Sequence, residues 1–133
     1  MKKTILVTGA AVRIGREIAL TFAKDGWNII IHCNSSTEKA EALAKEIKEN
    51  FDSSAKVVQA NLDKENHIER MIDEVKTCFG SLDAIVNNAS SFYPTPVGDL
   101  TLKDWDQLIG SNLKGPLFLI NGLIDLLKES KGV

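Results

Sequence analysis

The chain has 133 residues, which is too short for more than one domain. It is 44% apolar and 26% charged, with a formal net charge of −2 at pH 7, so no basic field would recruit nucleic acid or an anionic membrane surface. No apolar stretch approaches the roughly 18 residues of a membrane span. Cys33 and Cys78 lack metal-ligand spacing, which predicts buried free thiols, no metal site and a cytoplasmic location.

Apolar strands and periodic helices alternate along the chain. Strands are expected at about 4–8, 27–33, 56–60 and 83–87, and helices at about 14–25, 37–49, 64–78 and 101–128. Ser35, with Glu38 three residues later, predicts a capping box for the second helix. Thr101 is expected to cap the fourth helix, and Pro116 to kink it, because proline cannot donate to the preceding turn.

The near-continuous apolar character of the strands predicts a sheet covered on both faces. Strands of this kind that alternate with helices form parallel sheets, so the expected fold class is α/β, a Rossmann-type doubly wound parallel sheet. Residues 129–133 look like the approach to a further strand, so one flank of the sheet is expected to be uncovered. We expect residues 1–133 to form an incomplete domain of this type, truncated after about four βα units.

The segment 8–15 joins the first strand to the first helix and contains Gly9 and Gly15, six residues apart. A strand that turns through glycine into a helix directs several backbone N–H groups at one point, where the helix dipole adds partial positive charge. Gly9 allows the tight turn, and Gly15 allows a close approach of helix and strand. The segment therefore predicts a phosphate site. The alternative is an ordinary strand-to-helix turn without a ligand.

The residues after the second strand indicate which nucleotide would bind. An NAD-preferring site places a carboxylate there for the ribose hydroxyls. This chain has Asn34, Ser35 and Ser36 at that point, and no carboxylate. Hydroxyls and an amide can donate to a 2′-phosphate, and Arg13 could add a guanidinium, so NADP(H) is predicted over NAD(H). Alternatively, the two serines only cap the helix, and His32 could be a satisfied histidine at the strand end.

Four ordered motifs, spread over the whole chain, resemble those of the short-chain dehydrogenase/reductase family. They are Thr8-Gly9 with Gly15, Asn61-Leu62 after the third strand, the segment Asp83-Ala84-Ile85-Val86-Asn87-Asn88-Ala89, and Asn112 in the fourth helix. Within the family, the chain is most similar to the pteridine reductases, in Arg13 and in the stretch from Asn87 to Pro96. The resemblance implies NADPH-dependent reduction of a pterin or dihydrofolate ring.

The resemblance also assigns roles to single positions. The residues implied to contact NADP(H) are Gly9, Arg13, Ile14, Gly15, Asn34, Ser35, Ser36, Asn61, Leu62, Asn88, Ala89 and Ser90. Ser90 is also implied to bond to substrate, and Phe92 to stack on a flat pterin ring, with loop packing as the alternative for Phe92. Asn112 is implied to help hold a water of the family's proton relay, with a polar residue at a helix kink as the alternative. The sequence departs from the pattern at Asn61, where the family usually has Asp, and at Ser35, where pteridine reductases often have Arg.

The family's proton donor is a tyrosine followed four residues later by a lysine. These 133 residues lack that pair, because the only tyrosine, Tyr93, has Val97 four residues on. We therefore expect negligible turnover from this polypeptide alone. We also expect self-association into a homo-oligomer, through the exposed apolar surface of the fourth helix or through pairing of bare sheet edges. Two other interpretations are a catalytically inactive NADP(H)-binding module and a truncated remnant. The alternative enzyme is a 3-oxoacyl reductase or sugar dehydrogenase of the same family.

Overall fold

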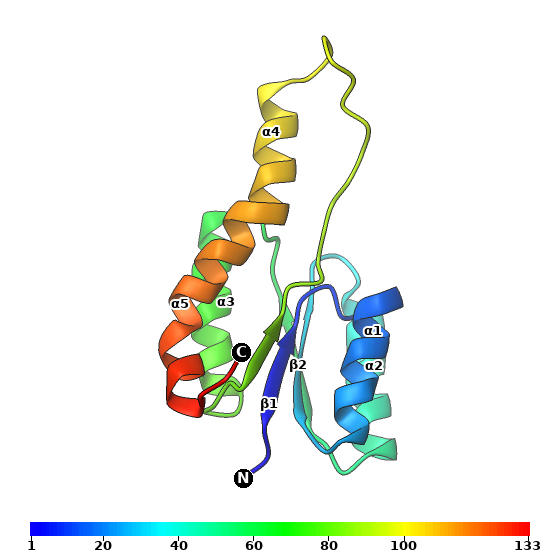
Figure 1. The fold of residues 1–133 in the computed structure, drawn as a ribbon. Coiled ribbons are helices and arrows are strands. Elements are labelled where there is room, and N and C mark those ends of the chain that lie inside the picture. Colours follow the sequence, from blue (N-terminus) through cyan, green and yellow to red (C-terminus); the bar gives the residue numbers. More distant parts are fainter.

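The computed structural model describes residues 1–133, in which four strands alternate with helices (Figure 1). The strands are β1 (Thr4–Val7), β2 (Asn28–Cys33), β3 (Ala55–Gln59) and β4 (Ala84–Val86). The helices are α1 (Arg13–Lys24), α2 (Thr37–Asn50), α3 (Glu65–Cys78), α4 (Leu102–Ile109) and α5 (Gly115–Ser130). A π-helical turn, η1 (Gly110–Lys114), joins α4 to α5. All strands and helices expected from the sequence are present, with ends shifted by one or two residues, except that the fourth helix is divided into three segments.

The strands form one parallel sheet in the order β3-β2-β1-β4. From β1 the chain builds the sheet outward on one side through β2 and β3, and then crosses to the other side to form β4. Val7 lies opposite Ile31 on one neighbour and Val86 on the other. This order confirms the Rossmann-type α/β fold, and it places a switch point between β1 and β4, where such sheets bind ligands beyond the carboxyl ends of the strands.

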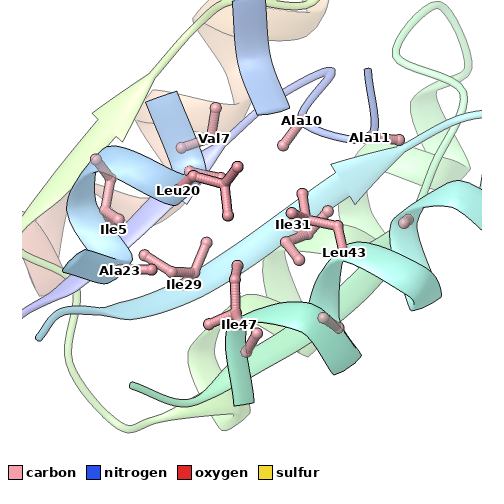
Figure 2. Packing of buried hydrophobic residues seen from close by; sticks show 14 of the residues in the cluster. Ile5, Val7, Ala10, Ala11, Leu20, Ala23, Ile29, Ile31, Leu43 and Ile47 are labelled. Carbon is pink, nitrogen blue, oxygen red and sulfur yellow. The ribbon is translucent and has the colours of Figure 1, made fainter. Parts of the chain in front are cut away.

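Two apolar layers explain why the strands are apolar throughout. Ile5 and Val7 belong to a cluster of 16 buried residues between the sheet and helices α1 and α2 (Figure 2). Leu6, between them in sequence, belongs to a second cluster of 12 buried residues under α3 and α5. Successive side chains of a strand point to opposite faces, so a sheet covered on both sides needs apolar residues at every position.

The capping box predicted for α2 is wrong. Helix α2 begins at Thr37 with Ser36 as its N-cap, and no side chain bonds to the free N–H groups there. With this N-cap, Glu38 is the second helical residue and not the third, so its carboxylate cannot complete a reciprocal box. The box predicted from Thr101 is present by contrast: Asp104 N donates to Thr101 Oγ1, and Thr101 N donates to Asp104 Oδ2.

The expected fourth helix is interrupted ahead of Pro116 by the π-helical turn η1, which ends at Lys114. Pro116 has no N–H, so the bond to the carbonyl four residues back cannot form, and a widened turn accommodates the break. Gly110 is the first residue of this turn, and Gly115 follows its last residue. A Cβ on Gly115 would lie 2.3 Å from Leu62 O, and one on Gly110 would lie 3.0 Å from Asp63 Cβ. The two glycines therefore let the helix approach the loop that follows β3.

The outer edge of β4 carries one further pairing. Val133 N donates to Asp83 O, and Ile85 N donates to Val133 O, so this residue lies along the flank that the sequence predicted to be uncovered. Asp83 itself has a structural contact, since its Oδ2 accepts from Thr4 N at 2.8 Å. None of the helices combines enough length with enough apolar character to cross a membrane.

Helix α4 and the loop before it extend well beyond the sheet (Figure 1). Several large apolar side chains are exposed on α4 and on the helical segments that follow it: Leu102, Trp105, Leu113, Leu117 and Phe118. Exposed apolar groups of this extent are typical of surfaces that bind another protein. The homo-oligomer inferred from the sequence stays a prediction.

Candidate functional site

The turn between β1 and α1 depends on its two glycines. Gly9 has φ = 61°, and a Cβ on it would lie 3.0 Å from Ala89 Cα. A Cβ on Gly15 would lie 2.3 Å from Gly9 O and 2.6 Å from Asn88 Nδ2. Both positions therefore lack room for a side chain because the turn packs closely on itself and on the segment after β4. This is the tight turn and close approach that the sequence predicted.

The backbone N–H groups of this turn fall into two sets. Gly9 N donates to His32 Nδ1 at 3.0 Å, and Ala10 N donates to His32 O at 2.9 Å. The N–H groups of residues 11–15 find no acceptor within the chain, and they stand at the start of α1. Open donors at a helix N-terminus suit a phosphate. Gly9 was predicted to line the pyrophosphate, but its own N–H is already engaged, so it contributes the shape of the turn.

Thr8 and Asn88 fasten the end of β1 to the segment after β4. Thr8 Oγ1 accepts from Asn88 N at 3.0 Å and from Ala89 N at 2.9 Å. The Asn88 side chain points back to the turn, where its Nδ2 donates to Thr8 O at 3.0 Å and to Gly9 O at 3.2 Å. In this structure the Asn88 side chain thus positions the glycine turn, and the contact with the nicotinamide ribose that the family resemblance implied stays a prediction.

A polar hollow of about 320 Å³ opens where the strands end. Its lining residues are His32, Asn34, Ala60, Asn61, Leu62, Asp63, Ala89, Ser90, Ser91, Tyr93, Gln107 and Ser111. They come from the carboxyl ends of β2 and β3, the loop after β4, and helical residues 107–111. Five predicted cofactor residues meet in this hollow: Asn34, Asn61, Leu62, Ala89 and Ser90. Asp63 adds a buried carboxylate oxygen, Oδ1, that has no partner and can accept from a ligand or water.

The structure does not bring Arg13 into this hollow. Arg13 has φ = 52°, and with Ile14 it lines a larger, open depression of about 600 Å³ over α1. That depression contains none of the residues at the strand ends, so we assign the candidate site to the polar hollow. Ser36 is the N-cap residue of α2, but neither Ser35 nor Ser36 donates or accepts a side-chain hydrogen bond, so both hydroxyls remain available to a ligand.

Asn34 is held by residues that the sequence did not single out. Gln59 Nε2 donates to Asn34 O at 3.0 Å and approaches Asn34 Oδ1 at 3.4 Å. Arg70 in turn donates to Gln59 O at 2.7 Å. Because Gln59 presents a donor to Asn34 Oδ1, the Asn34 Nδ2 group is left free to donate to a ligand. The sequence could not indicate this arrangement, because Gln59 in β3 and Arg70 in α3 are distant from Asn34 along the chain and come together only in the fold.

The loop after β4 is fixed to the π-helical turn by Asn112. Asn112 Nδ2 donates to Ser91 O at 2.7 Å, and Asn112 Oδ1 accepts from Ser91 N at 2.9 Å. Ser91 Oγ also bonds to Ser111 Oγ. Tyr93 in the same loop donates through its hydroxyl to Gln107 Oε1 at 2.9 Å. Asn112 therefore positions the loop here, and its role in a water relay stays a prediction.

Phe92 is 86% exposed, so it does not pack within the loop, and that alternative is wrong. An exposed aromatic ring in the loop whose residues Ser91 and Tyr93 line the hollow is consistent with stacking on a planar ligand. His32, by contrast, is buried, and both of its ring nitrogens have partners. Burial lowers the pKa of His32 from its ordinary value, so its ring is neutral at pH 7.

The glycine turn and the polar hollow lie together at the switch point of a parallel sheet, and residues 3–133 match the short chain dehydrogenase family. The chain belongs to this family. It is 44% identical to 3-oxoacyl-[acyl-carrier-protein] reductase FabG of Staphylococcus aureus over 116 residues. The aligned region covers 86% of this chain and 46% of that protein.

Solved structures of other proteins show the same fold. FolM alternative dihydrofolate reductase 1 from Brucella suis, in complex with NADP, has a TM-score of 0.87 and 34% identity. The match covers 94% of this chain and 51% of FolM. An alcohol dehydrogenase from Thermococcus sibiricus, complexed with 5-hydroxy-NADP, has a TM-score of 0.91 and 26% identity over 99% of this chain and 56% of its own. The chain thus spans about half the length of the relatives it matches.

Proposed function

We propose that this chain is the NADP(H)-binding part of a short-chain reductase. The observation that carries the proposal is the row of unpaired N–H groups at residues 11–15, beside the polar hollow at the strand ends. The chain's residues fit the cofactor, because the close packing at Gly9 and Gly15 holds the turn in a shape that leaves the N–H groups of residues 11–15 open to a diphosphate. When bound, the cofactor supplies a hydride from its nicotinamide ring.

Each part of the site has a distinct task in this proposal. The N–H groups of residues 11–15 receive the diphosphate, and the Thr8–Asn88 contacts hold the turn in that shape. Asn61 and Leu62 border the adenine, and Ala89 and Ser90 lie along the nicotinamide ribose. Asn112 keeps the loop that carries Ser90 in place through its bonds to Ser91. Arg13 and Ile14 are assigned to the outer side of the diphosphate.

The end of β2 supports NADP(H) over NAD(H). Asn34, Ser35 and Ser36 offer donors to a 2′-phosphate, and no carboxylate stands there to repel it. The contact from Gln59 leaves the Asn34 Nδ2 group as a donor. The complexes of the two structural relatives hold NADP and 5-hydroxy-NADP, which is consistent with this choice.

A pterin or dihydrofolate ring is the substrate that we propose for the whole reductase. The exposed ring of Phe92 lies in the loop that lines the hollow, and a flat heterocycle can stack on it. The structural relative FolM is an alternative dihydrofolate reductase, which supports this choice. A 3-oxoacyl thioester is the second candidate, because the FabG relative is 44% identical over the aligned residues.

A titration with both cofactors tests the proposal. We expect the Kd for NADPH, measured by calorimetry, to be at least about tenfold lower than that for NADH, a difference of about 1.4 kcal/mol. The matched variant Asn34→Asp keeps the size of the side chain but adds a carboxylate, so it should lose most of this preference. Equal affinities, or tighter binding of NADH by the unmodified chain, would contradict the assignment to NADP(H).

A further inference from the structure

His32 connects three strand ends through a single buried ring. It lies at the end of β2, in the middle of the order β3-β2-β1, and is 2% exposed. Its Nδ1 accepts from Gly9 N at 3.0 Å, just after β1. Its Nε2 lies 2.9 Å from Ala60 O, just after β3. The proposed function leaves this buried titratable group without a task.

These two partners fix the protonation state of the ring. Gly9 N–H can only donate, so Nδ1 must be free of a proton to accept. Ala60 O can only accept, so Nε2 must carry the proton. The neutral ring with its proton on Nε2 is the one state that satisfies both contacts. Burial lowers the pKa of His32, which favours this neutral state.

His32 also controls the first two peptide groups of the glycine turn. Its Nδ1 engages Gly9 N, and its carbonyl oxygen engages Ala10 N at 2.9 Å. Each peptide group is planar, so these two bonds orient the backbone that leads into residues 11–15. The donors without an acceptor begin immediately after the two that His32 holds. The shape of the phosphate-binding turn therefore depends on His32 Nδ1 remaining a hydrogen-bond acceptor.

We propose that His32 is a positioning residue for nucleotide binding: its neutral ring holds the turn through Gly9, and its protonation releases the turn and weakens binding. This inference rests on the proposed function. When a proton is added to Nδ1, two donors face each other at 3.0 Å, and the Gly9 bond cannot persist. The carbonyl bond to Ala10 does not depend on the ring, so protonation removes one of the two bonds that orient the backbone leading into residues 11–15.

The effect of His32 on the pH dependence of binding must be distinguished from the effects of other titratable groups nearby. Asp63 and Tyr93 line the same hollow, and His67 Nδ1 accepts from Asn61 N in the loop after β3. Residues 8–10, which approach His32 from β1, carry no titratable side chain. The 2′-phosphate of the ligand itself titrates near pH 6. A variant that lacks the imidazole but retains all these groups shares their contributions, so its difference from the unmodified chain reports on His32 alone.

Two variants each retain one of the two contacts of the ring and lose the other. In His32→Asn, the side-chain oxygen can stand where Nδ1 stood and accept from Gly9 N, but the contact to Ala60 is lost. In His32→Gln, the longer amide reaches the position of Nε2 and can donate to Ala60 O, but nothing accepts from Gly9 N. We expect the Kd for NADP⁺ at pH 8 to stay within about threefold in His32→Asn and to rise at least about tenfold in His32→Gln. The reverse order would show that the tie to Ala60 matters and would overturn the proposal.

The pH dependence supplies the second readout. As the pH falls from 8 toward the acidic limit of the folded state, the Kd for NADP⁺ should rise more in the unmodified chain than in His32→Asn, which has no ring to protonate. Because burial lowers the pKa of His32, the difference should appear at the acidic end of this range. Equal changes in the two proteins would overturn the proposal. Circular dichroism before each titration confirms that the variants are folded.

Amide hydrogen exchange tests the positioning without any cofactor. The Gly9 amide should be protected in the unmodified chain and in His32→Asn, and should exchange at least about tenfold faster in His32→Gln. If the unmodified chain binds no NADP⁺ but Gly9 exchange follows this order, the proposed function fails, while the control of the turn by His32 stands. If Gly9 exchange is the same in all three proteins, the inference about His32 is wrong whatever the cofactor does.

Discussion

Replacing Gly15 by alanine is expected to abolish measurable NADPH binding and to lower the free energy of unfolding by about 2–3 kcal/mol. The new Cβ would lie 2.3 Å from Gly9 O and 2.9 Å from Ala10 Cα, and both neighbours belong to the backbone. The clash can be relieved only if the turn moves away from α1, and this movement displaces the N–H groups of residues 11–15. Urea denaturation and calorimetric titration measure the two effects.

Gly122→Ala is the matched control for this experiment. A Cβ there would lie 2.3 Å from Ile72 Cδ1, the far end of a side chain that can rotate, at a contact between α3 and α5. We expect a smaller loss of stability and a Kd for NADPH within about twofold of the unmodified chain. If Gly15→Ala bound NADPH as tightly as Gly122→Ala, the glycine turn would not be the diphosphate site.

Replacing Asn88 by aspartate is expected to lower the free energy of unfolding by about 3 kcal/mol at pH 7.5. The substitution keeps the shape of the side chain but exchanges Nδ2 for an oxygen, which then faces Thr8 O and Gly9 O. Three acceptors without a donor repel one another, and the fastening between β1 and the segment after β4 opens. Once protonated, the introduced carboxyl can donate again, so the loss of stability should shrink on acidification.

Asn87→Asp provides the control, because it makes the same change one residue earlier, where the side chain is exposed and forms no hydrogen bond. Its effect on unfolding should stay within about 0.5 kcal/mol at both pH 7.5 and pH 5. Urea denaturation at these two pH values separates the variants. Similar losses in both, or a loss in Asn88→Asp that does not depend on pH, would contradict the role assigned to Asn88.

Much of the fold could be predicted from the sequence because its signals are local. A residue such as Leu6 stands between Ile5 and Val7, and an unbroken apolar run of this kind has one physical explanation, a sheet covered on both faces. The capping box at Ser35 could not be placed, because a shift of one residue in the start of α2 removes it. The π-helical turn depends on contacts of Gly110 and Gly115 with the loop after β3, which local patterns do not contain.

The candidate site was predictable to a smaller extent. The glycine turn and the residues after β2 and β3 follow from motifs, and Asn34 and Asn61 do meet in one hollow. The tasks of Asn88, Asn112 and His32 could not be read from the sequence. Each depends on a partner that is distant along the chain, such as Gly9 for His32 or Ser91 for Asn112. The sequence indicated which residues gather there, but not which of them hold the others in place.

The most direct test of the account is a map of amide chemical shifts, recorded by nitrogen-15 NMR while NADPH is added to the chain. The account predicts the largest changes at residues 11–15, with further changes at Asn34, Asn61 and Ser90. Changes restricted to the depression over α1, for example at Arg16 and Thr21, or no changes at a ligand concentration that saturates NADP-dependent enzymes, would contradict the claim that this turn binds a dinucleotide diphosphate.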